Sequence, residues 1–172
     1  LQMQSFRNAL AVLQENLHGP FYPVKGNHDV RGEGAREAYN QVMLPYLNQV
    51  LSPREPATGA ADYAMMYERD LYIFFDCMEP DLGFVENALA EHPDARYVFF
   101  LTHFPVLPCS FRDSAQVVFG RPDQAEQRRK LIALLAGRHA IVLCGHIHRT
   151  TLVCYRSPEG TVTQLSAFSL VG

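Results

Sequence analysis

The chain has 172 residues, 48% of them hydrophobic, which is enough for one domain with a substantial core and too few for two. A formal net charge of −3 and an isoelectric point near 6.2 exclude a broadly basic surface, so nucleic-acid binding is not expected. The longest apolar runs have strand length, well below the roughly 20 residues of a membrane helix, and we expect no membrane segment. Four isolated cysteines favour free thiols and, weakly, a reducing cytoplasmic compartment, which leaves localisation open.

The first third of the chain is predicted to be mainly helical. Residues 3–17 carry apolar side chains at alternating spacings of three and four, which predicts an amphipathic helix that His18-Gly19-Pro20 ends. A short apolar run predicts a strand over residues 21–25. A helix is predicted over residues 35–50, which Pro45 is expected to weaken or kink. Residues 52–60 hold two prolines and a glycine and are expected to form a surface loop.

The rest of the chain alternates predicted strands and helices. In order, the patterns predict a hairpin over residues 62–67 and 71–75, a helix over 82–92, a strand over 97–101, a helix over 124–136 capped by Asp123, a strand over 140–144 and a closing hairpin over 151–156 and 161–165. Residues 104–122 have no clear period and contain three prolines, so we expect a substrate-facing loop there. This order indicates the α/β class.

Three of the predicted strands end on polar loops that carry metal-type side chains. The loops are Gly26-Asn27-His28-Asp29, Thr102-His103 and Gly145-His146-Ile147-His148. Because ligand sites in α/β sheets gather at the carboxyl ends of the strands, these loops can converge although they are far apart in sequence. Taken alone, the first motif is equally compatible with a simple turn. Two imidazoles at period two on an extended segment point to the same side, which favours a metal site.

In this order the three motifs resemble those of the calcineurin-like metallophosphoesterase superfamily. The resemblance implies an α/β fold in which a two-sheet sandwich is flanked by helices. The superfamily also has an Asp-x-His strand end and a Gly-Asp-x-x-Asp loop before its Gly-Asn-His-Asp/Glu motif, and neither is present here. We therefore expect a single metallophosphoesterase domain over residues 1–172 whose first two motifs have been cut away at the N-terminus.

The resemblance also implies a set of metal ligands. Asn27, His103 and His146 would bind one divalent ion, and His148 would bind the other. Amide and imidazole donors suit Mn, Fe, Zn or Ni. The complete domain is expected to hold two ions. This chain, which offers three donors to one ion and a single donor to the other, is expected to hold one ion or none.

The remaining roles follow from the same resemblance. It implies that His28 protonates the leaving-group oxygen and that Asp29 orients its imidazole, which agrees with the acid–base chemistry of His near neutral pH. Asp76, at the end of an apolar strand, is expected to fix a loop by a hydrogen bond. Arg149, directly after the last motif, is expected either to meet a phosphate or to lie on the surface.

The expected function is hydrolysis of phosphomonoesters or phosphodiesters by a binuclear centre in the complete protein. One alternative is a non-catalytic scaffold or inert fragment of the same fold. Another is a mononuclear zinc hydrolase built on Asn27, His103 and His146. The expected partner is a phosphoester substrate. Without the two N-terminal motifs, a sheet edge would be exposed. We expect the chain to associate with itself through this edge, to bind a separate N-terminal segment there, or to be poorly stable.

Overall fold

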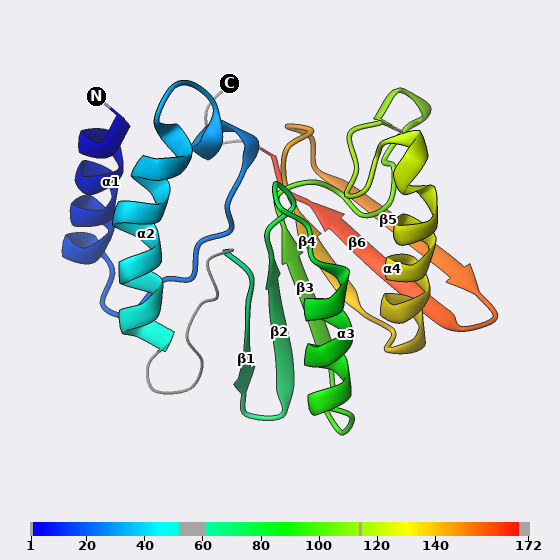
Figure 1. Cartoon of the computed structure of the whole chain (residues 1–172). Coiled ribbons are helices and arrows are strands. Elements are labelled where there is room, and N and C mark those ends of the chain that lie inside the picture. The colour runs from blue at the N-terminus through cyan, green and yellow to red at the C-terminus, as the bar shows by residue number, and fades with distance from the viewer. Residues whose placement is uncertain (1, 52–60, 114, 169–172) are drawn as a thin grey trace.

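The computed structural model describes residues 2–51, 61–113 and 115–168, which form one six-stranded mixed sheet with helices around it (Figure 1). The helices are α1 (Gln2–Asn16), α2 (Ala35–Leu51), α3 (Leu82–Glu91) and α4 (Ala125–Gly137), with the short 3₁₀ helices η1 (Asn27–Val30), η2 (Phe111–Asp113) and η3 (Pro122–Gln124). The strands are β1 (Tyr63–Tyr67), β2 (Asp70–Phe75), β3 (Val98–Thr102), β4 (Ile141–Cys144), β5 (Thr151–Ser157) and β6 (Gly160–Ser166).

The sheet has the strand order β1-β2-β3-β4-β6-β5. The four central strands run parallel, and β1 and β5 pair antiparallel with β2 and β6 at the two edges. In this register Leu101 of β3 lies opposite Leu143 of β4, close to the carboxyl ends of both strands. The loops that follow β3 and β4 therefore leave the sheet side by side.

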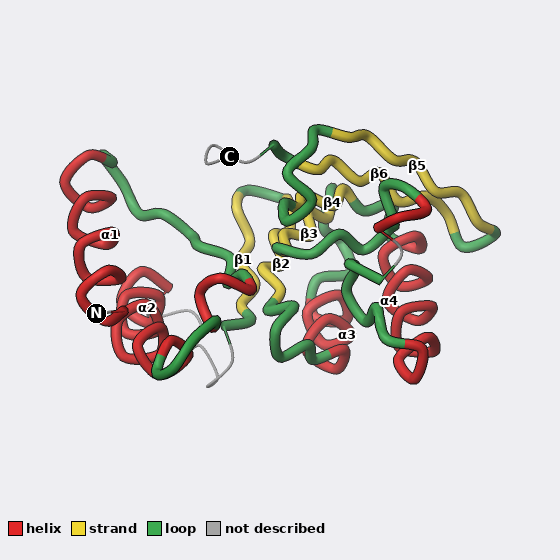
Figure 2. Tube along the Cα trace, turned by 90° about the horizontal axis from the view of Figure 1, so that it is seen from above, coloured by secondary structure: helices red, strands yellow, loops and turns green. Residues whose placement is uncertain are grey.

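One face of the sheet is covered by α3 and α4, which lie on the same side of it (Figure 2). The strand residues on this face are apolar, and Phe75, Phe100 and Val142 pack into one buried cluster. Val85 of α3 and Leu131 of α4 fill the other side of that cluster and are fully buried. Because burial of each such side chain contributes roughly 1.5–3 kcal/mol, this layer fixes the sheet that carries the loops.

The other two helices, α1 and α2, pack against each other beyond β1 (Figures 1 and 2). The ring of Phe6 in α1 meets that of Tyr39 in α2 edge-on, with centroids 5.6 Å apart. The end of α2 reaches the sheet through Leu47, which clusters with Tyr63 and Phe74. The chain between the two helices crosses to the sheet and returns (Figure 1). This excursion carries the first sequence motif.

The α/β class and the flanking helices are confirmed, and every predicted helix and strand outside residues 21–25 begins and ends within one residue of its prediction. The predicted surface loop over residues 52–60 lies outside the described residues. The helix α2 continues through Pro45. The prediction that Asp123 caps α4 is wrong, because Asp123 lies in η3 and pairs with Arg121, while Gln124 takes the capping position without a side-chain hydrogen bond. Within the part of the chain that the structure describes, no helix has the length and apolar character to cross a membrane.

Residues 21–25 do not form the predicted strand, and the described residues make one sheet where two were expected. Side chains satisfy this backbone in place of a strand ladder. Phe21 N donates to Tyr46 Oη over 2.9 Å, and the same hydroxyl donates to Phe21 O over 3.0 Å. Tyr63 Oη donates to the carbonyl of Pro23 over 2.7 Å. Since Pro23 has no N–H to give to a ladder, the segment serves as an extended link between α1 and the first motif.

Candidate active site

The three sequence motifs meet at one end of the sheet. Gly145 N donates to His103 O over 3.1 Å, which joins the loop after β4 to the loop after β3. The first motif approaches the same place through Gly26, where an added Cβ atom would lie only 2.9 Å from His103 Nδ1. Real Cβ atoms essentially never come that close, so glycine is required at position 26. An added Cβ atom on Gly145 would lie 3.9 Å from the same nitrogen, an ordinary contact.

Donor atoms from all three loops converge on His103. Its Nε2 atom lies 2.8 Å from Asn27 Oδ1 and 3.3 Å from His146 Nδ1. The rings of His103 and His146 stand at 68° with centroids 5.1 Å apart, and Phe104 packs against the His146 ring at 4.2 Å. The structure therefore brings together three of the four side chains that the sequence marks as metal ligands.

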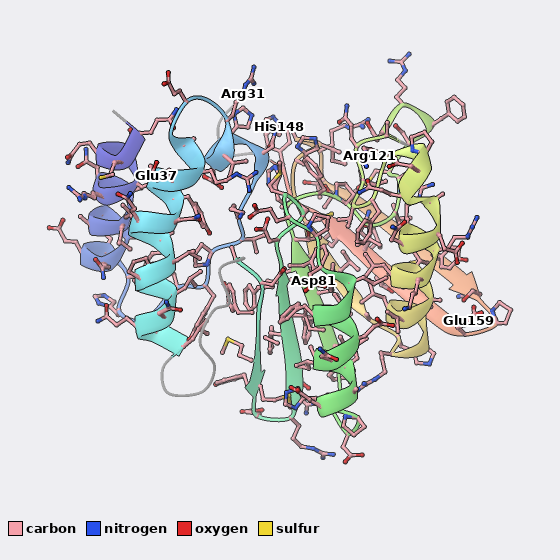
Figure 3. All side chains as sticks on the ribbon, in the orientation of Figure 1. Arg31, Glu37, Asp81, Arg121, His148 and Glu159 are labelled. Carbon is pink, nitrogen blue, oxygen red and sulfur yellow. The ribbon has the colours of Figure 1, made fainter. Side chains whose placement is uncertain are left out.

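The fourth, His148, follows a backbone that differs from the sequence prediction. The predicted extended segment is instead a compact turn, because His146 and His148 have φ angles of +66° and +50° and Ile147 N donates to Gly145 O over 2.8 Å. The argument that period two sends both imidazoles to one side therefore rests on a wrong backbone. Figure 3 shows His148 at the same upper end of the molecule as Arg31, which follows the first motif.

The first motif is closed by Asp29. Gly26 N donates to Asp29 Oδ2 over 2.8 Å, and Asp29 N donates to Gly26 O over 3.2 Å, which starts the 3₁₀ helix η1. The sequence interpretation gave Asp29 the task of orienting His28, whereas the hydrogen bond of its carboxylate goes to Gly26. Burial raises the pKa of Asp29, and that hydrogen bond and then the charge of His28 oppose the rise. Asp29 thus fixes the loop, and His28 is left exposed on it.

Burial also sets the protonation state of the donors. The pKa of His103 is lowered to about 4, first by burial and then by the positive charges of His146, His28 and His148. Burial, followed by the charges of His148 and His28, lowers the pKa of His146 as well. Both imidazoles are therefore favoured in the neutral form that ligates metals. The same charge effects indicate that His28 and His148 lie close enough to His103 and His146 to interact with them electrostatically.

These donors fit one divalent ion. Bonds of about 2.1 Å at a tetrahedral angle hold two ligand atoms about 3.4 Å apart, close to the 3.3 Å between His146 Nδ1 and His103 Nε2. With the same bond length, the 2.8 Å between His103 Nε2 and Asn27 Oδ1 corresponds to a ligand–metal–ligand angle nearer a right angle. Among the described residues, no three His, Cys, Asp or Glu side chains are grouped around a common point. Among the described side chains, the amide of Asn27 is thus the candidate for a third ligand beside His103 and His146.

Comparison with known proteins identifies the family of the chain. The sequence model of the calcineurin-like phosphoesterase family matches residues 4–150, a span that includes all three motifs. The chain belongs to this family. A comparison with curated proteins gives no significant match. Membership in the calcineurin-like phosphoesterases implies metal-dependent phosphoester hydrolysis as the general chemistry, with divalent metals as cofactors and a phosphoester as substrate.

In this calcineurin-like phosphoesterase a buried ion pair supports the first motif. Lys25 Nζ pairs with Asp76 Oδ2 and lies 3.0 Å from Glu79 Oε2. Lys25 is 1% exposed and Asp76 is fully buried. Asp76 also accepts a hydrogen bond from Met78 N over 2.9 Å, the loop-fixing role that its position predicted. The sequence analysis missed Lys25, whose one visible signal is a lysine inside an apolar run directly before a glycine.

A second ion pair ties the loop of residues 104–122 to the last motif. Arg149 Nη2 donates to Asp113 Oδ2 over 2.5 Å, and Ser110 Oγ donates to the same oxygen over 2.6 Å. Asp113 is buried, while Arg149 is about half exposed. Arg149 thus binds a carboxylate of its own chain, a role that the sequence analysis had not considered. The pair holds the long loop beside the last sequence motif.

Proposed function

We propose that this chain carries a metal site and a proton donor for the hydrolysis of phosphomonoesters or phosphodiesters, within a domain that uses a binuclear centre when complete. The observation that supports this most strongly is the convergence of Asn27 Oδ1 and His146 Nδ1 on His103 Nε2, at 2.8 and 3.3 Å. The three atoms come from three loops that are far apart in sequence. Two histidines and an amide that meet in one half-buried cluster are the donor types of a metal site.

Each residue has a task in this proposal. Asn27, His103 and His146 would hold one ion, and His148 would contribute to the second. When bound, divalent ions offset the charge of the phosphoryl group and supply a nucleophilic water. His28 stands next to Asn27 on an exposed turn whose start is fixed by the hydrogen bonds between Gly26 and Asp29. From there His28 can donate a proton to the oxygen of the departing alcohol.

The experiment compares metal content with turnover. The purified chain is loaded with Mn²⁺ or Zn²⁺, dialysed, analysed for bound metal, and assayed with nitrophenyl and alkyl phosphate esters. His103→Ala should lose both metal and turnover. His28→Asn should keep the metal and lower alkyl-ester turnover by roughly 10²–10⁴-fold, with a smaller loss for the nitrophenyl ester, whose leaving group needs less protonation. His18→Ala, an exposed histidine after α1, is the matched control and should change neither.

A non-catalytic scaffold is the second candidate. It is favoured by one observation, that no group of three His, Cys, Asp or Glu side chains able to hold a metal ion is found in the described part of the chain. The same experiment separates the two functions. Metal bound by the wild-type chain without turnover above the His103→Ala background would support the scaffold. Loss of metal in His28→Asn would show that His28 is a ligand.

A further inference from the structure

A cavity opens beside His28, on the side where α1 packs against the first motif. It has a volume of about 320 Å³ and is lined by Gln2, Ser5, Phe6 and Ala9 of α1, by His28 and Asp29 of η1, and by Ala35 at the start of α2. The lining therefore combines the proposed proton donor with one face of a helix that the metal site does not use.

The cavity and the metal donors share one short turn, η1. Asn27, the neighbour of His28 in η1, has its Oδ1 atom 2.8 Å from His103 Nε2. His28 itself is close enough to His103 and His146 for its charge to act on both. A phosphoryl group held at the donors would therefore have its departing oxygen near His28 and the rest of the alcohol directed toward α1.

The lining indicates the chemistry of a ligand. Phe6, Ala9 and Ala35 give the cavity an apolar wall, and the ring of Phe6 is held edge-on against Tyr39. Gln2 donates from Nε2 to Arg31 O over 3.3 Å, while its Oε1 atom is buried without a hydrogen-bond partner. The Gln2 side chain therefore ties α1 to Arg31, the residue that ends η1. Asp29 is the one charged residue of the lining besides His28, and it disfavours an anion.

The size of the cavity limits the ligand further. An engineered cavity of about 150 Å³ is enough to take up benzene, and drug-sized ligands occupy pockets of roughly 300–1,000 Å³. A cavity of about 320 Å³ thus suits one substituted ring.

We propose that this cavity, here called the α1 pocket, is the leaving-group site, and that it takes a neutral alcohol with one ring. The proposal rests on the proposed function, because it needs a phosphoester whose alcohol departs beside His28. It assigns substrate selection to α1, a helix that contributes no residue to the metal site. Phosphoesters of small ring alcohols are then better substrates than methyl or anionic esters.

The binding test needs no catalysis. 4-Hydroxybenzyl alcohol is titrated into the isotopically labelled chain while the side-chain NMR signals of His28 and Phe6 are followed. Both signals should shift with saturation, and 4-hydroxybenzoate, an anion of similar size, should shift them much less. Ala9→Trp, which fills the pocket from an exposed position of α1, should abolish the shifts. Ala11→Trp, the same change outside the pocket on the same helix, should preserve them.

The kinetic test separates this inference from the proposed function. With benzyl phosphate, Ala9→Trp should lower kcat/KM by about 10- to 100-fold, the effect of leaving one ring in water, and should change the value for methyl phosphate and the bound metal little. The proposal would be overturned if Ala9→Trp left the turnover of both esters unaffected, or if the NMR shifts persisted in that variant. A wild-type chain that hydrolyses neither ester would refute the proposed function, and the titration would still decide whether the pocket binds the alcohol.

Discussion

Replacing Lys25 by Met should destabilise the fold strongly. The Lys25 side chain is 1% exposed and pairs with Asp76, which is fully buried. Glu79, the second partner of Lys25, is 40% exposed and is also bound by Arg36. Within the described residues no other cation pairs with Asp76. The substitution therefore leaves a carboxylate in the interior without a counter-charge.

The magnitude follows from the burial of both partners. Removing one member of a buried ion pair costs about 3–5 kcal/mol, because the remaining charge has lost both water and partner. A domain has only about 5–15 kcal/mol of stability in total. With a urea dependence of about 2 kcal/mol per molar, the unfolding midpoint should fall by about 1.5–2.5 M.

Urea unfolding followed by circular dichroism measures this effect. The chain has two lysines, and the second is a matched control, because Lys130 Nζ lies 2.6 Å from Glu86 Oε1 in a pair whose side chains are 51% and 38% exposed. Lys130→Met should cost no more than about 1 kcal/mol. Replacing both Lys25 and Asp76 by apolar residues should recover much of the loss. A cost for Lys25→Met within 1 kcal/mol of the Lys130→Met value would refute the reasoning.

Two further predictions follow from the surroundings of the site. Gly26→Ala places a methyl group 2.9 Å from His103 Nδ1, so metal affinity measured by calorimetry should fall by about 10- to 100-fold. Gly145→Ala, the control, should have little effect on that affinity. Equal losses of affinity in the two variants would contradict this prediction. Burial raises the pKa of Asp62 from 3.8 to about 7. Because the folded pKa is the higher one, Asp62 contributes stability below pH 4 that is lost as the pH rises through 7. Asp62→Asn should remove this pH-dependent loss of unfolding free energy, which amounts to up to about 4 kcal/mol between pH 4 and pH 8. If the unfolding free energies of the two proteins instead change in parallel with pH, Asp62 does not titrate in this range.

The strand-end argument predicted the meeting of the last two motifs without any knowledge of the strand order. It worked because β3 and β4 are parallel neighbours, so the residues that follow them start at the same edge of the sheet. The first motif follows no strand and reaches this edge at the end of the extended link over residues 21–25. The close approach at Gly26 depends on the ring of His103, which is far away in the sequence. Local patterns were also sufficient for the positions of the described helices and strands.

The errors share a physical cause, which is that distant groups decide local conformation. An apolar run such as residues 21–25 becomes a strand only if another strand pairs with it, and here the hydroxyls of Tyr46 and Tyr63 bind its backbone instead. Left-handed backbone is usually signalled by Gly or Asn, so nothing local marked it at His146 and His148. The Lys25–Asp76 pair joins residues about fifty positions apart, which no periodicity reveals.

The same geometry makes a prediction about metal stoichiometry. The donors of the first ion are held by the fold itself, because the Gly145–His103 and Gly26–Asp29 hydrogen bonds and the Lys25–Asp76 pair require no metal. For the proposed second ion the described residues offer His148, which belongs to no group of three His, Cys, Asp or Glu side chains. The chain should therefore bind one divalent ion, measured by metal analysis after dialysis. His148→Ala should leave that ratio unchanged, whereas His103→Ala should abolish binding, because His103 is the residue on which the other two donors converge. Two tightly held ions per chain, one of them lost in His148→Ala, would show that a side chain outside this cluster completes the second site.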